Sequence, residues 1–155
     1  MTATPYLNEL AEWFAKLRLD TVMIGNAAAA INGAPVTTLD VDFMLKQTDE
    51  NYRKLAVLAQ RMRCQFIEMK LLDNKYMYRL VNQADMLVID FLFAPAGIES
   101  LEALKKNSMD VFFGEHVLRI AALEDILASK RMAGRPKDMA IIPILEMTLN
   151  EKRRQ

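Results

Sequence analysis

The spacing of apolar residues along the chain predicts helices and strands that follow one another. Apolar residues three and four apart are typical of a helix with one buried face, while short β-branched runs are typical of buried strands. The helices predicted in this way span residues 6–17, 27–31, 48–63, 98–106, 122–133 and 136–150. The predicted strands span residues 21–24, 39–45, 64–71, 76–81, 86–93, 111–113 and 116–120.

Turn and cap residues set the expected boundaries. Asn26 is placed to cap the helix of residues 27–31, and Gly33 to end it. The segment Asp73-Asn74-Lys75 separates two strands as a hairpin turn does. Gly134 is expected to end the helix of residues 122–133, and Pro143 to kink the last helix.

The order of these elements predicts an α/β fold, with a mixed central sheet flanked by helices and a helical C-terminal part over about residues 122–150. A chain of 155 residues is of the size of one domain, so we expect residues 1–155 to form a single domain. We see no internal repeats and no linker.

Charge and composition exclude several classes of protein. Twenty basic residues balance twenty acidic residues, so no bulk attraction to nucleic acid or anionic membrane is expected. The single cysteine, Cys64, excludes a disulfide framework and a cysteine zinc cluster. Neither a secretory signal nor a membrane-spanning apolar stretch is visible, which indicates a cytoplasmic protein.

Two aspartates mark the first candidate site. Asp40 and Asp42 are two residues apart in a predicted strand, so both project from one face, with Leu39, Val41 and Phe43 on the opposite, buried face. With ten aspartates in 155 residues, roughly 0.6 such pairs arise by chance, so the pair alone is weak evidence. An edge strand that uses charge against aggregation would show the same pattern.

A third aspartate, Asp90, lies inside the apolar run of residues 86–93. A carboxylate among so many apolar neighbours is costly unless a cation meets it. One such cation is an arginine, for example Arg79, and a buried aspartate that caps a loop would also account for Asp90. The other is Mg²⁺, which prefers oxygen ligands and would suit three converging aspartates.

Gly25 and Asn26 form the second candidate element, at a predicted strand-to-helix turn. A glycine in this position lets backbone N–H groups approach a phosphate. A turn glycine without any ligand would look the same.

Taken together, these motifs resemble the nucleotidyltransferase superfamily of the DNA polymerase β type, and in particular its small bacterial minimal and AbiEii-toxin-like groups. The resemblance spans Met23 to Leu145 and is carried by Gly25-Asn26-Ala27, Thr38-Leu39-Asp40-Val41-Asp42, Asp90, and the segment from Lys130 to Gly134-Arg135-Pro136-Lys137-Asp138. It implies transfer of a nucleoside monophosphate from an NTP such as ATP to an acceptor hydroxyl, with release of pyrophosphate.

The resemblance also implies a role for each matching residue. It implies that Asp40, Asp42 and Asp90 ligate Mg²⁺ or Mn²⁺ and act in catalysis. It also implies that the nucleotide is bound by Gly25, Asn26, Thr38, Lys130 and Lys137. Lys130 would also be accounted for as a solvated helix lysine. The acceptor could be a small molecule, a tRNA end or a protein hydroxyl, and a homodimer or partner protein could complete the site.

The chain departs from the family pattern at two positions. Asn26 stands where the family usually has Gly or Ser, and Val36 where related sequences often carry Arg. These departures favour an alternative: a catalytically weak or inactive member that binds a nucleotide or a partner protein, for example in a toxin–antitoxin or defence system.

Overall fold

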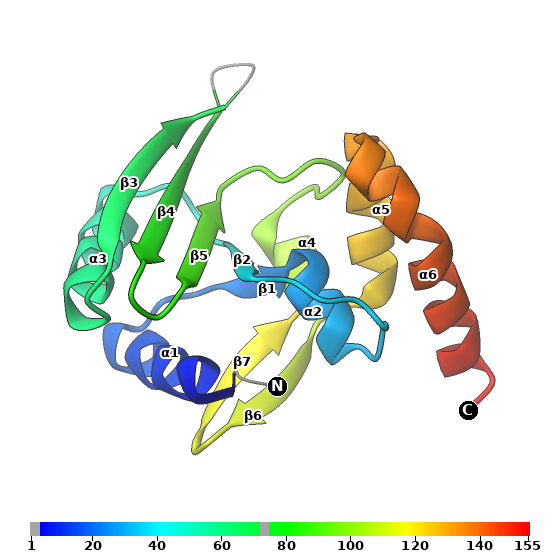
Figure 1. The fold of residues 1–155 in the computed structure, drawn as a ribbon, viewed down its shortest axis with the longest axis horizontal. Helices are drawn as coiled ribbons and strands as arrows, with labels where there is room; N and C mark the ends of the chain where they lie inside the picture. Colours follow the sequence, from blue (N-terminus) through cyan, green and yellow to red (C-terminus); the bar gives the residue numbers. More distant parts are fainter. Residues whose placement is uncertain (1–3, 72–74) are drawn as a thin grey trace.

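The structure is a computed structural model that describes residues 4–71 and 75–155, and within these ranges it holds one mixed seven-stranded sheet flanked by helices (Figure 1). The strands are β1 (Val22–Ile24), β2 (Asp40–Met44), β3 (Gln65–Lys70), β4 (Tyr76–Asn82), β5 (Leu87–Leu92), β6 (Met109–Phe113) and β7 (His116–Ile120). The helices are α1 (Thr4–Leu17), α2 (Gly25–Ile31), α3 (Asp49–Arg61), α4 (Leu101–Asn107), α5 (Leu123–Ala133) and α6 (Pro136–Arg153).

The strand order is β3-β4-β5-β2-β1-β7-β6, so the segments that carry the candidate aspartates are neighbours in the middle of the sheet. The β2–β5 and β1–β7 pairs are parallel, and the other pairs are antiparallel. This arrangement confirms the predicted mixed sheet.

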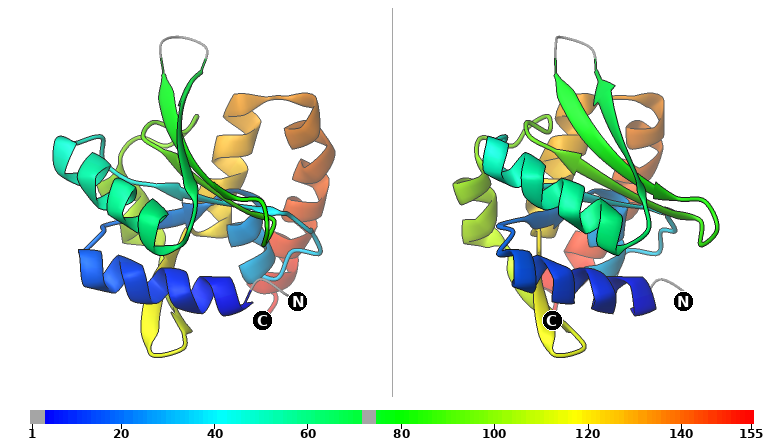
Figure 2. Two further views of the ribbon diagram at one scale, coloured as in Figure 1. Left: turned by 60° about the vertical axis from the view of Figure 1, so that its left-hand side comes forward. Right: turned by 90° about the vertical axis from the view of Figure 1, so that its left-hand side faces the viewer.

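Helices α1 and α3 cover one face of the sheet (Figure 2). Phe14 of α1 packs edge-on against Phe43 of β2, with ring centroids 4.9 Å apart, and also contacts Phe91 of β5. Tyr52 of α3 packs on the outer strands, edge-on against Tyr78 and tilted against Phe66. Helices α1 and α3 therefore cover the apolar face of the strands, and the opposite face of the central strands carries the aspartates.

Helices α2, α5 and α6 lie on the other side of the molecule, with α5 and α6 packed together (Figures 1 and 2). Helix α5 ends at Gly134, whose φ of 61° is the left-handed value that glycine adopts without strain, as predicted. Pro136 then opens α6, which contains Pro143 and continues to Arg153. The kink at Pro143 stays a prediction. No helix in the described residues is both long and apolar enough to cross a membrane.

Three local predictions are corrected by the structure. Asn26 does not cap α2: the helix already begins at Gly25, with Ile24 as its cap residue, and no side chain caps its first turn. Leu39 precedes β2 and is 74% exposed, whereas Val41 and Phe43 are buried as expected. The helix expected over 98–106 begins only at Leu101. The hairpin expected at Asp73-Asn74-Lys75 lies, apart from Lys75, outside the described residues.

Candidate functional site

Asp42 and Asp90 lie side by side on the face of the sheet that α1 and α3 leave open. They are paired in register in the parallel strands β2 and β5, and Asp40 lies two residues before Asp42 on the same face. Arg79 of β4 pairs in turn with Asp90. Strand register therefore places the three aspartates on one face of the sheet, with Asp42, Asp90 and Arg79 side by side and Asp40 opposite Val88 in the adjacent row.

Arg79 holds Asp90 through both carboxylate oxygens. Its Nε donates to Oδ1 at 2.7 Å and its Nη2 to Oδ2 at 2.9 Å, a bidentate geometry that is strong for an ion pair. The side chain of Asp90 is only 8% exposed, whereas that of Arg79 is 33% exposed. The arginine partner considered from the sequence is thus the one present here.

Asp42 has no such partner among the described residues, and the pKa of its carboxyl is raised to about 6. Burial is the largest cause, and the charges of Asp90 and Asp40 add to it. Lys130 and Lys137 oppose the shift without cancelling it. The ionised Asp42 is therefore short of positive charge, which a bound cation would supply.

Gly25 allows the backbone to come close to Asp42. A Cβ at position 25 would lie 2.6 Å from Oδ2 of Asp42, and the φ of Gly25 is +71°. Beside it, the Oδ1 atom of Asn26 is buried without a hydrogen-bond partner, the one such side-chain atom in the part of the chain that the structure describes. An unpaired buried acceptor costs about 1–3 kcal/mol, so Asn26 carries an unsatisfied amide oxygen beside Gly25.

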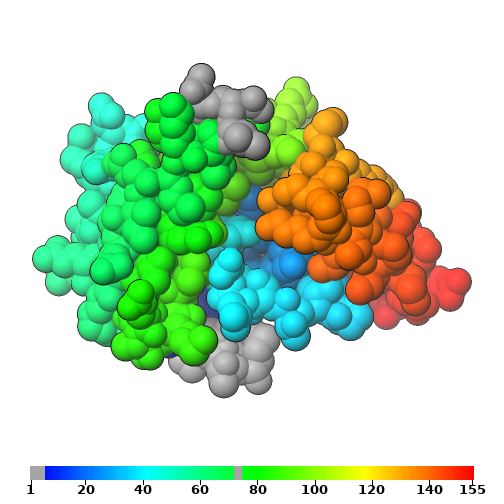
Figure 3. All heavy atoms as spheres, turned by 45° about the horizontal axis from the view of Figure 1, so that its top comes forward, coloured from blue at the N-terminus to red at the C-terminus, as the bar shows by residue number. Residues whose placement is uncertain are grey.

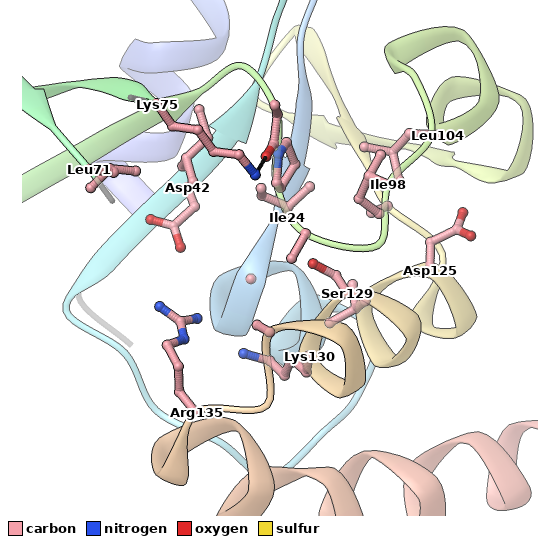
Figure 4. A pocket seen from close by; sticks show the side chains of 18 residues that line it. Ile24, Asp42, Leu71, Lys75, Ile98, Leu104, Asp125, Ser129, Lys130 and Arg135 are labelled. Atoms are coloured by element: carbon pink, nitrogen blue, oxygen red, sulfur yellow. Dashed lines mark hydrogen bonds between the residues drawn. The ribbon is translucent and has the colours of Figure 1, made fainter. Parts of the chain in front are cut away.

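A cavity of about 460 Å³ opens beside Asp42, between the sheet and α5. Figure 3 shows the hollow between the green strands and the orange helices. In Figure 4 the side chains of Asp42, Lys130 and Arg135 point toward the same space. Gly25 and Lys75 also line it, and this size is typical of a small-molecule site.

Lys130, Arg135 and Asp138 form a charged cluster at the α5–α6 junction. Asp138, which is 1% exposed, accepts from the Nε of Arg135 at 2.6 Å and lies 3.7 Å from the Nζ of Lys130. Burial alone would raise the pKa of Asp138, but its contacts with Arg135 and Lys130 outweigh burial and lower it. Burial lowers the pKa of Lys130, which Asp138 and Asp42 only partly offset. Asp138 thus fixes two cations beside the cavity.

Thr38 and Lys137, two further predicted site residues, and Val36, the position that departs from the family pattern, are not among the residues that line the cavity. Thr38 is exposed, and its hydroxyl both donates to the carbonyl of Asp40 and accepts from its N–H, which orients the start of β2. Lys137 is exposed, and its charge is near enough to lower the pKa of Asp42. Val36 packs, partly buried, against the core. Nucleotide binding by Gly25, Asn26, Thr38, Lys130 and Lys137 stays a prediction.

The donor chemistry at this site suits a hard divalent cation, since the side chains offer carboxylate oxygens and Asp42 is short of positive charge. The present side-chain arrangement does not form a complete cage: within residues 4–71 and 75–155, no group of three or more Asp, Glu, His or Cys side chains is arranged to hold a metal ion. Arg79 occupies both oxygens of Asp90 instead. Metal binding by Asp40, Asp42 and Asp90 therefore stays a prediction.

Two cavity cations, Arg135 and Lys75, were missed from the sequence. Arg135 lies within the motif Gly134-Arg135-Pro136, and its position just before the α6 start was the signal that could have identified it. No sequence pattern marks Lys75 as a cavity residue. Its Nζ donates to the carbonyl oxygen of Ala94, 3.4 Å away, and Ala94 is distant in the sequence.

Comparison with known proteins gives a fold but no close relative. No protein-family model matches the sequence, and no characterised protein matches it at the level of sequence. Solved structures do match. The solution structure of the antibiotic-resistance factor ANT(2'')-Ia has a TM-score of 0.64 at 11% identity, covering 96% of this chain and 84% of that one. Another structure of ANT(2'')-Ia holds adenylyl-2''-tobramycin.

Two further structures resemble the chain over nearly the whole length of both proteins. A Thermotoga maritima protein assigned as a nucleotidyltransferase, TM1012, has a TM-score of 0.61 at 18% identity, covering 97% of this chain and 96% of that one. The lincosamide adenylyltransferase LnuA, solved with lincomycin bound, has a TM-score of 0.61 at 8% identity and covers 94% and 96%. At these identities the likeness establishes the nucleotidyltransferase fold, and activity has to be argued from the site.

Proposed function

We propose that this protein is a metal-dependent nucleotidyltransferase that moves a nucleoside monophosphate from an NTP, such as ATP, to an acceptor hydroxyl. The observation that carries the proposal is the position of Asp42. It is partly buried beside Asp90 and Asp40, short of positive charge, and faces a cavity lined by Lys130 and Arg135. A carboxylate cluster opposite cations suits a site for a metal-bound triphosphate. The nucleotidyltransferase fold supports the same reading.

In this proposal Asp40, Asp42 and Asp90 would hold Mg²⁺ or Mn²⁺, which would supply positive charge to neutralise the triphosphate. Lys130 and Arg135 neutralise the remaining phosphate oxygens from the opposite wall, with Lys137 nearby. The acceptor oxygen forms a bond to the α-phosphorus, the bond from that phosphorus to the bridging oxygen breaks, and pyrophosphate leaves with the bonding electrons. The hydroxyl proton would pass to Asp90, which requires Arg79 to release one of the two oxygens that it holds.

Gly25, Asn26 and Thr38 complete the proposed nucleotide side of the site. Gly25 contributes most directly, because it lines the cavity and leaves room for Asp42. Thr38 acts through the backbone of Asp40, which it fixes by two hydrogen bonds. We place the protein in the cytoplasm, where NTP and Mg²⁺ are available.

The test is transfer of label from α-³²P-labelled ATP in the presence of Mg²⁺ or Mn²⁺, with cell RNA, protein and small-molecule extracts supplied in separate reactions. The Asp42→Asn variant should lose transfer. Asp110→Asn is the matched control, because Asp110 is exposed on β6 and lies outside the cavity lining. The absence both of transfer and of metal-dependent ATP binding in the wild-type protein would contradict the proposal.

A second candidate is a member of the fold that binds a nucleotide or a partner protein without transferring the nucleotide, as in a toxin–antitoxin pair of the AbiEii-like kind. The ion pair of Arg79 with Asp90 favours it, because Arg79 occupies the carboxylate that would accept the proton. Under this alternative, ATP binds but no label transfers, and Arg79→Met does not create transfer.

A further inference from the structure

The cavity beside Asp42 carries cations on two separate walls. Lys130 and Arg135 approach it from α5 and from the start of α6, whereas Lys75 approaches it from the residue immediately before β4. In Figure 4 the side chain of Lys75 extends past Asp42 on one side, and those of Arg135 and Lys130 face Asp42 from the other. Positive charge is therefore available to a ligand from both sides of Asp42.

The charge of the helical wall is already partly neutralised. Asp138 accepts from the Nε of Arg135 at 2.6 Å and lies 3.7 Å from the Nζ of Lys130, so one carboxylate serves both cations. Two positive charges and one negative charge leave this wall with a single net positive charge. A triphosphate carries several negative charges, so a further cation on the facing wall would help to balance them.

The ammonium group of Lys75 is held by a weak contact. Among the described residues its Nζ donates to the carbonyl oxygen of Ala94, a neutral acceptor 3.4 Å away, which is long for a hydrogen bond. A phosphate oxygen is a charged acceptor and forms shorter and stronger hydrogen bonds with an ammonium group. A phosphate within reach would therefore compete well with this carbonyl for Lys75.

The main chain of Lys75 is fixed, but its side chain has room to move. Its carbonyl oxygen accepts from the N–H of Leu71 at 2.6 Å, and β4 begins at the next residue. Lys75 is exposed, and together with Leu92 and Ala94 it lines both the main cavity and a second cavity of about 170 Å³. The long flexible stem of a lysine can use this space to follow a ligand.

We propose that Lys75 binds the phosphate chain of the nucleotide from the wall that faces Lys130 and Arg135. The inference rests on the proposed function for the identity of the ligand, but it concerns binding and can be tested without transfer. Contacts from both walls would hold the phosphate chain in a defined orientation beside Asp42. Because Lys75 is exposed, its contribution should decrease as the ionic strength rises.

The test measures binding of inorganic tripolyphosphate with Mg²⁺ by titration calorimetry, since this probe has the phosphate chain without the sugar and the base. Lys75→Met keeps the length of the side chain and removes its charge, so it should weaken binding about fivefold at low salt. This loss should shrink when NaCl is added. Lys75→Arg keeps a cation and should bind within about twofold of the wild type.

Lys70→Met is the matched control for the charge of the protein as a whole. Lys70 is exposed on β3, next to Met69 but on the opposite face of the sheet, and it is not among the residues that line the cavity. This variant should bind tripolyphosphate like the wild type.

Three results would overturn the inference: no binding of tripolyphosphate by the wild type, unchanged binding by Lys75→Met, or equal losses in Lys75→Met and Lys70→Met. Urea unfolding of Lys75→Met completes the test. Lower stability with wild-type affinity would mean that the contact with Ala94 serves the fold alone.

A parallel reaction with labelled ATP and Mg²⁺ separates this inference from the proposed function. If tripolyphosphate binds and requires Lys75 but no label is transferred, the transferase function fails while the role of Lys75 stands. If the wild type and Lys75→Met transfer label equally and bind tripolyphosphate equally, the function stands and the inference fails.

Discussion

Arg79 forms a bidentate ion pair with Asp90 across the β4–β5 pair, at the centre of the candidate site. The guanidinium thus occupies the position of a cation on Asp90, the least exposed of the three candidate aspartates. A metal ion bound here would have to share Asp90 with Arg79 or displace it. This relationship makes the first prediction possible, because stability and metal binding respond to Arg79 in opposite directions.

Arg79→Met should destabilise the fold by about 2 to 3 kcal/mol, since it leaves the buried Asp90 charge unpaired while keeping most of the apolar contact. Urea unfolding measures this cost. In the double variant with Asp90→Asn the cost should largely disappear, because no buried charge remains. Adding Mg²⁺ should stabilise Arg79→Met more than the wild type. Equal Mg²⁺ effects in both proteins would show that Arg79 does not compete with a metal.

The pH dependence of stability should reveal Asp42. Its pKa is raised from 3.8 to about 6 in the folded protein, so the folded state binds more protons than the unfolded state between these values. The contribution of Asp42 to stability therefore falls as the pH rises from about 4 to 6, by up to about 3 kcal/mol. We expect Asp42→Asn to be more stable than the wild type above pH 6 and similar to it near pH 4.

This Asp42 prediction is checked by urea unfolding of both proteins across that pH range without divalent ions. The difference between wild type and variant isolates Asp42 from the other carboxylates. Repeating the series with Mg²⁺ should stabilise the wild type at pH 7 and leave Asp42→Asn unchanged. A gap that does not vary with pH would contradict the assignment of a charge-deficient Asp42.

Much of the fold follows from local patterns in the sequence, because helices and strands have different periods. The runs around Phe43 and Phe91 are apolar on the face that packs on α1, and their strands appear where the pattern predicts them. The prediction that Leu39 is buried was wrong, because Leu39 continues the alternation but lies before the first residue of β2 that pairs with β5. The periodic pattern carries no information on where pairing starts.

Only those site residues could be predicted whose type conflicts with their neighbours in the sequence. Asp42 and Asp90 stand out as charges in apolar runs, but their adjacency arises from the β2–β5 pairing, which sequence patterns do not specify. Arg79 was one of several possible partners for Asp90 until the β4–β5 register singled it out. The sequence likewise did not show that α2 begins at Gly25, which leaves Asn26 inside the helix rather than at its cap.

Gly25→Ala and Gly33→Ala form a matched pair that separates backbone strain from crowding. Both glycines have positive φ, but an added Cβ meets Oδ2 of Asp42 at 2.6 Å in the first and nothing within 4 Å in the second. Gly33→Ala should therefore cost about 1 kcal/mol of strain, and Gly25→Ala about 3 kcal/mol. Binding of Mn²⁺, followed by its electron paramagnetic resonance signal, should weaken only in Gly25→Ala. Equal losses in the two variants would mean that the close approach to Asp42 has no role.

Asp138→Asn should loosen the cation cluster beside the cavity. The variant loses the charge that binds Arg135 and Lys130, so we expect the free energy of unfolding to fall by about 2 kcal/mol and ATP binding to weaken about tenfold.

Because the pKa of Asp138 is lowered on folding, its stabilising contribution is present above pH 3.8 and is lost as the pH falls through the folded value. The stability gap between wild type and variant should thus be constant from pH 6 to 8 and close below about pH 4, opposite in sign to that of Asp42→Asn. Urea unfolding and ATP titration calorimetry test both parts, with Asp110→Asn as the control for an exposed aspartate. If ATP affinity were unchanged while stability fell, Asp138 would serve the α5–α6 junction alone, and Lys130 and Arg135 would not need it to face the nucleotide.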